Sequence, residues 1–237
     1  MPPILIQKIL KTINLSTEDI LSQENKIFTF LNPVSYITAS SNRGLFQKFN
    51  AVFADGSILV SFIHLLYGRK VTRRSFDMTS LAPQLFEYAK TNNKSIYLVA
   101  SQAKEINKFV NIIQDNYPEI NICGYHSGYF VSKEERNNEI QRILRLNPYF
   151  LIIGMGILKQ EEFLVEIKEK GFSGIGFTCG GFVHQTSNNK IEYYPKWIDK
   201  YNLRFIYRMY KEKHTRKRYL KAAFIFPFIF FKDKLKY

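Results

Sequence analysis

The feature that most constrains the fold is an apolar run that ends abruptly in glycine and charge. Residues 149–156 read YFLIIGMG, and the charged cluster KQEE follows at 159–162. An unbroken apolar run of this length is typical of a strand buried on both faces of a parallel sheet. Because ligand loops follow the carboxyl ends of such strands, we expect a ligand at this point.

Further apolar runs alternate along the chain with amphipathic segments. The first amphipathic segment begins at the acidic turn STED, residues 16–19. Alternation of this kind predicts an α/β fold, in which crossover helices join the strands of one sheet. We expect strands within residues 35–40, 50–57, 94–101, 120–130, 149–156 and 171–181. We expect helices over residues 56–68, 104–117 and 159–171.

The composition shifts near residue 190, where a basic tail rich in aromatic residues begins. The 237-residue chain has a formal net charge of +14 and a pI of about 9.6, and much of the excess lies between residues 190 and 221. A polyanion, a phosphate-bearing ligand or an anionic membrane surface would each suit this bias. We therefore expect an α/β core over residues 1–189 and an appendage over residues 190–237.

Near its end the tail contains a ten-residue apolar run, residues 222–231. Lys221 and Lys232 flank this run, and Pro227 interrupts it. It is shorter than the roughly 20 apolar residues that cross a bilayer. It is either a terminal helix packed on the core or an interfacial anchor, whose phenylalanines enter the acyl boundary while bases meet anionic headgroups. We favour the anchor, because an exposed phenylalanine stripe would otherwise promote aggregation. The residues expected to contact the membrane are Phe224, Phe226, Phe228, Phe230 and Phe231.

Several kinds of site lack a signature in this sequence. Cys123 and Cys179 have no C-x-x-C partner, and the four histidines show no metal-ligand spacing. There is no pair of carboxylates of the kind that holds a nucleotide-bound divalent cation, so we expect no metal and no cofactor. No nucleic-acid-binding motif accompanies the charge, so nucleic acid is not an expected partner. The amino terminus lacks the features of a signal peptide, which favours a cytoplasmic protein.

Two acidic residues and one loop are candidates for chemistry. Asp55 follows an apolar strand and precedes a glycine, so it is either a general base in a cleft or the N-cap of the next helix. Asp77 either caps a helix or faces the cleft, and capping is the favoured alternative. The loop at 154–161 lacks the third glycine of a dinucleotide fingerprint. It is therefore either a tight turn or, with its polar Lys-Gln-Glu, a ligand loop at a strand's carboxyl end.

Four blocks of the sequence resemble, in the same order, those of one enzyme family. They are ADG at 54–56, YPEINI and the following GYF within 117–130, GMGILKQE at 154–161, and YYPKWIDKYNLRFIYRMYKEKHTRKRYL at 193–220. In this combination the chain is similar to the WecG/TagA/CpsF glycosyltransferase family (glycosyltransferase family 26). The resemblance extends over most of the chain and is far more specific than any single block.

The resemblance implies a Rossmann-like α/β enzyme with a mostly parallel sheet flanked by helices. Members of this family transfer a sugar from a UDP-sugar donor to a polyprenyl-diphosphate-linked sugar in bacterial cell-surface polysaccharide synthesis, and they invert the anomeric carbon without a metal. The match assigns Asp55 as the general base and places Thr38, at the end of a preceding strand, near the reacting sugar. It also implies that the tail is a lid, and with the tail's composition it predicts peripheral attachment to the inner face of the cell membrane.

The other matched positions fall into two groups. The residues expected to bind the donor nucleotide are Gly154, Gly156, Lys159, Gln160, Glu161, Gly128 and Tyr129. The residues expected to bind the diphosphate or the acceptor are Arg204, Arg208, Arg216, Arg218 and Asp77. Arginines in this position would stabilise the leaving diphosphate as a metal otherwise does.

Three departures from the family pattern fall in the blocks that would form the site. Leu158 replaces a proline, Tyr194 replaces an arginine and Val183 replaces an aspartate. They leave open the donor sugar and whether activity is changed or abolished. The sequence as a whole leaves open the acceptor sugar, the linkage and the polysaccharide. Two other functions remain alternatives: a catalytically degenerate scaffold in a membrane-bound assembly, suggested by Val183, and a nucleic-acid-binding protein, suggested only by the charge and the many aromatics. The sequence also leaves open whether the chain forms a homo-oligomer.

Overall fold

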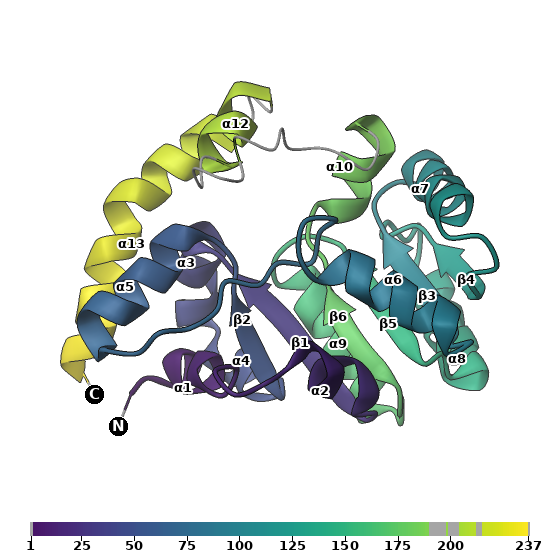
Figure 1. Cartoon of the computed structure of the whole chain (residues 1–237), viewed down its shortest axis with the longest axis horizontal. Helices are drawn as coiled ribbons and strands as arrows, with labels where there is room; N and C mark the ends of the chain where they lie inside the picture. The colour runs from purple at the N-terminus through teal and green to yellow at the C-terminus, as the bar shows by residue number, and fades with distance from the viewer. Residues whose placement is uncertain (1, 190–197, 199–203, 212–214, 237) are drawn as a thin grey trace.

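A six-stranded parallel sheet forms the centre of the molecule (Figure 1). The computed structural model describes residues 2–189, 198, 204–211 and 215–236. The strand order is β2-β1-β6-β5-β3-β4 and every pairing is parallel, which confirms the α/β, Rossmann-like prediction. The strands are β1 (Lys26–Leu31), β2 (Ala51–Ala54), β3 (Ile96–Ala100), β4 (Ile122–His126), β5 (Phe150–Gly154) and β6 (Ile175–Thr178).

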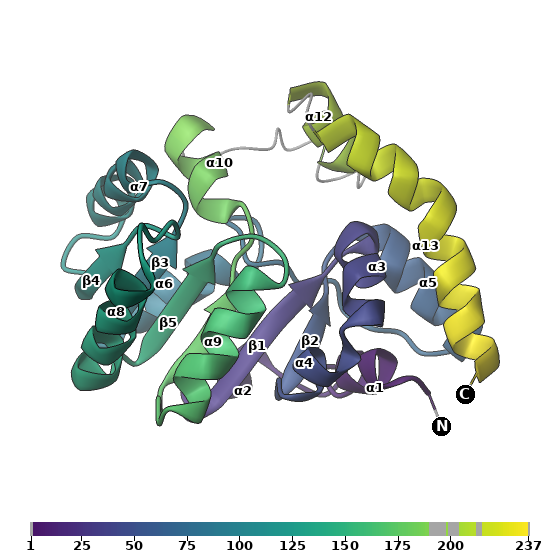
Figure 2. The same cartoon turned by 180° about the vertical axis from the view of Figure 1, so that it is seen from behind.

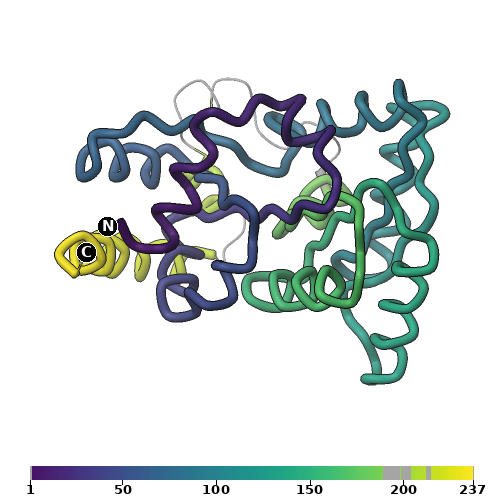
Figure 3. The backbone as a smooth tube through the Cα atoms, turned by 90° about the horizontal axis from the view of Figure 1, so that it is seen from below, coloured from purple at the N-terminus to yellow at the C-terminus, as the bar shows by residue number. Residues whose placement is uncertain are grey.

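Helices cover both faces of the sheet, as Figures 2 and 3 show from behind and from below. Alternate residues of β5 point to opposite faces, so Leu151 and Ile153 join one core cluster while Phe150 and Ile152 join the other. This is why the strand is apolar throughout. The first cluster includes α1 (Ile4–Leu10), α3 (Pro33–Ser41), α4 (Arg43–Gln47), α5 (Ser57–Tyr67), α8 (Lys133–Leu146) and α9 (Lys159–Glu169). The second includes α2 (Thr17–Ser22), α6 (Leu81–Thr91), α7 (Ala103–Asn116) and α10 (Phe182–Asn189).

The strand predicted at residues 35–40 is wrong, because these residues form helix α3. Asn32 caps the helix: its side-chain oxygen accepts hydrogen bonds from the backbone amides of Val34 and Ser35, each at 3.0 Å. Pro33 at the first position has a φ already suited to the helix. These caps outweigh the β-branched residues that suggested a strand. The strand that precedes β2 is β1, which ends at Leu31.

The other predicted strands and helices are confirmed, but sequence reasoning did not assign β1 or α8. The signal for α8 was present, because Ser132 and Glu135 have the spacing of an N-terminal cap. The Glu135 amide donates to Ser132 Oγ at 3.0 Å. The start predicted at residues 16–19 is α2, where Ser16 and Asp19 form a capping box.

The carboxyl-terminal helices α12 (Arg204–Lys211) and α13 (Arg216–Lys236) lie above and beside the strand ends, with α13 running along α3 and α5 (Figure 1). The inner face of α13 is anchored by a buried polar contact. Asp233 accepts a hydrogen bond from Tyr36 at 3.0 Å and pairs with Arg43. Phe226 and Phe230 pack against Phe62 of α5.

Membrane contact is therefore a wrong prediction for Phe226 and Phe230, which are buried in the core. The same helix turns Phe224 (81% exposed) and Phe228 (71%) outward, together with the partly exposed Phe231. The helix thus combines both alternatives posed by the sequence, a packed face and an exposed phenylalanine face. Within the described part of the chain, no helix has the length and apolarity to cross a membrane. The boundary at residues 189/190 stays a prediction.

Candidate active site

A cleft of about 1100 Å³ opens at the carboxyl ends of the strands. Helices α10 and α12 stand over this end of the sheet (Figure 1). The cleft is lined by side chains that follow β1, β2, β3, β5 and β6, and by parts of α3, α10, α12 and α13. Ligands bind at this end of open parallel sheets, where the strand order reverses.

Asp55, directly after β2, lies on the wall of this cleft and is half-buried. Its backbone amide donates to the Leu31 carbonyl at 2.8 Å, which holds it beside the end of β1. The N-cap of α5 is Gly56, with φ of 105° and no side-chain cap, so the capping alternative for Asp55 is wrong. Among the described residues, none donates a hydrogen bond to the Asp55 carboxylate. Asp55 lines the cleft, so a ligand in the cleft can reach it.

The surroundings of Asp55 make it a stronger base than a free aspartate. Burial raises its pKa to about 6; the neighbouring Asp77 adds to the shift, and Arg73, Arg204 and Arg208 oppose it. At pH 7 such a carboxylate is mostly ionised, yet it accepts a proton more readily than one with the ordinary value of 3.8.

Asp77 faces the cleft, so the favoured capping alternative is wrong. One of its oxygens accepts a hydrogen bond from Arg204 at 3.0 Å, and the other accepts from the Thr79 amide at 2.9 Å. The N-cap of α6 is Ser80. Asp77 thereby ties α12 to the loop before α6, at the wall of the site.

Four arginines line the cleft: Arg73, Arg204, Arg208 and Arg218. Arg73 was missed by sequence reasoning, because no motif connects it to Asp55. Arg208 lies against α10, where the Gln185 amide oxygen accepts from its guanidinium at 2.8 Å. Arg216, predicted to bind the diphosphate, instead donates to the Met209 carbonyl at 2.8 Å and does not line the cleft.

Only some of the residues in the loop after β5 that were predicted to bind the donor nucleotide line the cleft. Gly154, Gly156 and Gln160 line it, whereas Lys159 is exposed elsewhere. Glu161 is 0% exposed, so the prediction that it contacts the nucleotide is wrong.

The Glu161 carboxylate stabilises the loop through buried hydrogen bonds. It accepts hydrogen bonds from the Leu158 amide at 2.7 Å, from Gln160 at 2.8 Å and from Thr29 at 3.0 Å. Thr29 also lies 2.8 Å from Thr178, so the network joins β1, β6 and α9. Gln160 in turn accepts from the Gly180 amide at 3.1 Å. This network fixes the shape of the cleft floor.

Gly128 and Tyr129 have different places in the structure. Tyr129 is exposed and lines the cleft. Gly128 lies behind the wall, where an added Cβ would meet Met155 at 3.0 Å and the Ser101 amide at 3.2 Å. Gly128 therefore permits close packing rather than contacting a ligand.

Thr38 lines the cleft, but from helix α3 and not from a strand end. The strand-end position beside Asp55 belongs to Asn32, which also lines the cleft. The expectation that Thr38 ends a strand is therefore wrong, although Thr38 does line the cleft.

A second polar group lies across the cleft, after β3, and was also missed. It consists of Ser101, Glu105 and His184, all of which line the cleft. The S-x-x-x-E spacing after a buried strand was the available signal for Ser101 and Glu105. His184 comes from α10 and could be found only in the folded structure.

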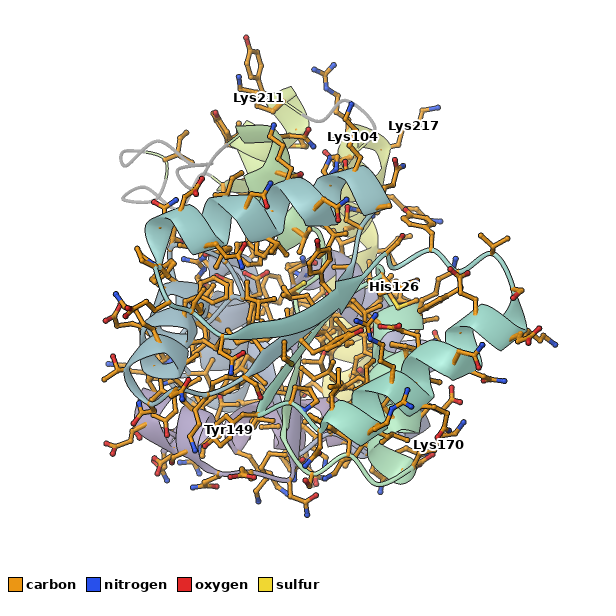
Figure 4. The ribbon with its side chains drawn as sticks, turned by 90° about the vertical axis from the view of Figure 1, so that its right-hand side faces the viewer. Lys104, His126, Tyr149, Lys170, Lys211 and Lys217 are labelled. Carbon is orange, nitrogen blue, oxygen red and sulfur yellow. The ribbon has the colours of Figure 1, made fainter. Side chains whose placement is uncertain are left out.

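The cleft end of the molecule also carries exposed lysines. Lys104, Lys211 and Lys217 lie at this end in Figure 4, whereas Tyr149 and Lys170 lie at the opposite end. Within the described ranges, no group of three or more metal-ligating side chains gathers.

Two of the three departures from the family pattern can be placed. Val183 is buried in the core cluster of α10. Leu158 has φ of 69°, a value that proline cannot adopt, and it caps α9 through its backbone amide. Tyr194 lies outside the described residues.

Comparison with known proteins agrees with this geometry. The Glycosyl transferase WecG/TagA/CpsF family matches residues 6–237. The chain is 37% identical over 200 residues, 83% of each protein, to the UDP-Gal:alpha-D-GlcNAc-diphosphoundecaprenol beta-1,4-galactosyltransferase of Shigella boydii. It is 26% identical over 198 residues, 82% of this chain and 75% of the relative, to the N-acetylglucosaminyldiphosphoundecaprenol N-acetyl-beta-D-mannosaminyltransferase of Bacillus subtilis. The chain therefore belongs to the WecG/TagA/CpsF family of glycosyltransferases.

Proposed function

We propose that the protein transfers a hexose or N-acetylhexosamine from a UDP-sugar to a polyprenyl-diphosphate-linked N-acetylglucosamine, with inversion, in the synthesis of a cell-surface polysaccharide. The observation that carries the proposal is Asp55, an accessible carboxylate with raised pKa at the strand ends, faced by arginines. The relatives support the substrate classes, because their names specify a UDP-sugar donor or a diphosphoundecaprenol-linked acceptor.

The proposed reaction is a single displacement. Asp55 removes the proton from an acceptor hydroxyl, whose oxygen attacks the anomeric carbon of the donor sugar. A new carbon–oxygen bond forms as the bond to the β-phosphate of UDP breaks, and the electron pair leaves with UDP. Because attack and departure occur on opposite faces, the anomeric configuration inverts.

The arginines would stabilise the leaving diphosphate. Arg204 and Arg208 of α12, together with Arg73, act on the charge of Asp55 and line the same cleft. Guanidinium groups can donate two parallel hydrogen bonds to phosphate oxygens, and in a cleft sheltered from water their charge acts strongly. We therefore propose that the reaction proceeds without a divalent cation.

The first test is UDP release from UDP-galactose, UDP-N-acetylmannosamine and related donors, with a short-chain polyprenyl-diphosphate N-acetylglucosamine and EDTA. Acceptor-dependent release with one donor would identify the sugar and support metal independence. Release that requires added Mg²⁺ or Mn²⁺ would contradict the arginine role. UDP binding without turnover of any donor would favour the degenerate scaffold instead.

The lipid-linked acceptor would reach Asp55 from the side of α13. The cleft is lined there by Ala222, Phe226 and Pro227 of α13 and by Phe62 of α5. The outward phenylalanines Phe224, Phe228 and Phe231 lie on the same helix, after Lys221. We propose that this face rests on the inner leaflet, with bases at the headgroups.

Point substitutions test this attachment better than removal of the tail, which would also take Phe226 and Phe230 from the core. The variant replaces Phe224, Phe228 and Phe231 with serine, and its control replaces the exposed Tyr125, Val131 and Leu146, which lie on or near β4 and α8. Only the α13 variant should lose co-sedimentation with phosphatidylglycerol vesicles. Equal binding by the α13 variant and the wild type would contradict the proposal.

A further inference from the structure

The polar cluster at the end of β3 has no part in the displacement at Asp55. Glu105 accepts a hydrogen bond from Ser101 through one oxygen, and His184 Nδ1 lies 2.6 Å from the other. Asn188 of α10 donates to the His184 carbonyl at 2.9 Å and more weakly to Glu105 at 3.5 Å. Three separate elements thus converge on the Glu105 carboxylate, at a wall of the cleft.

The carboxylate determines which nitrogen of His184 carries a proton. Burial raises the pKa of Glu105, but hydrogen bonds from Ser101, His184 and the Gln102 amide outweigh it, and the pKa lies below its ordinary value. An ionised carboxylate only accepts, so Nδ1 of His184 is the protonated nitrogen. Nε2, on the far side of the ring, points away from Glu105. The His184 side chain is 49% exposed in the cleft.

The distance from Asp55 identifies the part of the donor that reaches this cluster. Asp55 follows β2 and Ser101 follows β3, which are four strand positions apart in the sheet order. Four spacings of ~4.8 Å amount to roughly 19 Å. Between them lie glycines that follow β5 and β6, Gly156 and Gly180, where backbone can approach a diphosphate closely. A donor whose anomeric carbon lies at Asp55 would therefore place its nucleoside at the end of β3.

We infer that His184, oriented by Glu105, binds the nucleoside of the donor through a hydrogen bond between Nε2 and a ribose hydroxyl. The inference rests on the proposed function, since it assumes a nucleoside diphosphate sugar in this cleft. Glu105 is a positioning residue, because its oxygens are already engaged by Ser101 and His184. The neighbouring Val183 is buried, so His184 supplies the polar contact of α10 at this point.

Calorimetric titration with UDP, 2′-deoxy-UDP and 3′-deoxy-UDP tests the contact. The wild type should bind one deoxy analogue about five- to tenfold more weakly than UDP. His184→Phe, which keeps a ring but has no ring nitrogen, should bind UDP more weakly by a similar factor and no longer discriminate against that analogue. Glu105→Gln should weaken UDP binding in the wild-type background and have no further effect in His184→Phe.

The controls use exposed residues outside the cleft, His64→Phe on α5 and Glu87→Gln on α6, and both should bind all three nucleotides as the wild type does. A His184→Phe protein that melts normally and still discriminates against the deoxy analogue would overturn the inference. Unchanged affinity of His184→Phe for UDP would do the same. A wild-type protein that binds no UDP at all would instead overturn the proposed function, and the inference with it.

Discussion

Two carboxylates near the strand ends, Asp55 and Glu161, have pKa values raised by burial, yet their surroundings differ. Glu161 is enclosed and accepts hydrogen bonds from Thr29, Gln160 and the Leu158 amide. Asp55 is half-buried, faces arginines and, among the described residues, accepts no hydrogen bond. Burial disfavours both charges, but only one carboxylate has its lone pairs occupied by the protein. The difference separates a carboxylate that holds the cleft in shape from one that can accept a proton from a ligand.

The largest expected effect follows from removing the charge of Asp55. Asp55→Asn should lower turnover about 10²–10⁴-fold, the range typical of a lost general base. UDP affinity should stay within a few-fold, because the arginines and the glycine loop remain. Steady-state kinetics and a UDP titration measure the two effects. Asp115→Asn, an exposed aspartate on α7, is the control. Turnover within a few-fold of the wild type would show that Asp55 is not the base.

Glu161→Ala should act on stability instead. It would leave Thr29 and the Leu158 amide without their acceptor in a buried network, so we expect the free energy of unfolding to fall by about 2–4 kcal/mol. Denaturant unfolding measures this change, and Glu162→Ala, exposed on the same helix, should cost less than about 0.5 kcal/mol. If Glu161→Ala melted normally but lost UDP binding, the assignment of the two carboxylates to different roles would fail.

Because of Asp55, turnover should rise with pH over the range in which the stability of the fold falls. Turnover should rise with pH and level off above about pH 6, where the carboxylate is ionised. Its pKa is 3.8 in the unfolded chain and about 6 in the folded one, so the folded state holds the proton more tightly. The contribution of Asp55 to stability therefore falls as pH rises from about 4 to about 6.

Asp55→Asn removes this cost, so at pH 7 it should raise the free energy of unfolding by about 1–2 kcal/mol. A melting temperature higher by about 2–6 °C would be the observable for a domain of this size. The difference from the wild type should vanish below pH 4. Equal stability of the two proteins at pH 7 would mean that Asp55 is hydrated well enough to have an ordinary pKa.

Five of the six strands, β2 to β6, could be predicted because they carry their own signal, whereas β1 was missed. The apolar run before Gly154 and the one before Asp55 are buried on both faces, and burial on both faces leaves few alternatives to a parallel strand. Residues 35–40 were predicted as a strand from their β-branched composition, which is a weak local preference. The cap at Asn32 and the packing of Tyr36 under α13 stabilise a helix there instead.

Some residues of the site could be predicted from the sequence, and others could be found only in the folded structure. Asp55 and the glycines after β5 follow strands directly, so their place in the cleft is determined by the sheet. Arg73 and His184 approach from a loop and from α10, and only the folded chain shows which strand end they meet. Glu161 was predicted to bind because it belongs, with Gln160, to the loop that matches the family pattern. Adjacent residues on a helix point in directions about 100° apart, so Gln160 lines the cleft while Glu161 is buried.

The smallest effect expected in the Glu161 region concerns the backbone of Leu158. Its φ of 69° is unfavourable for a residue with a Cβ, but its side chain also packs against the first core cluster. In Leu158→Gly the relieved strain and the lost packing oppose each other, so the free energy of unfolding should change by less than about 1 kcal/mol. Leu158→Pro should lower the free energy of unfolding, because proline forbids this φ and has no amide to donate to Glu161. Thermal melting of the two variants compares them directly. If the proline variant matched the wild type, the loop would have a second stable shape that does not depend on the Leu158 amide, and the structural role assigned to Glu161 would be smaller than its hydrogen bonds indicate.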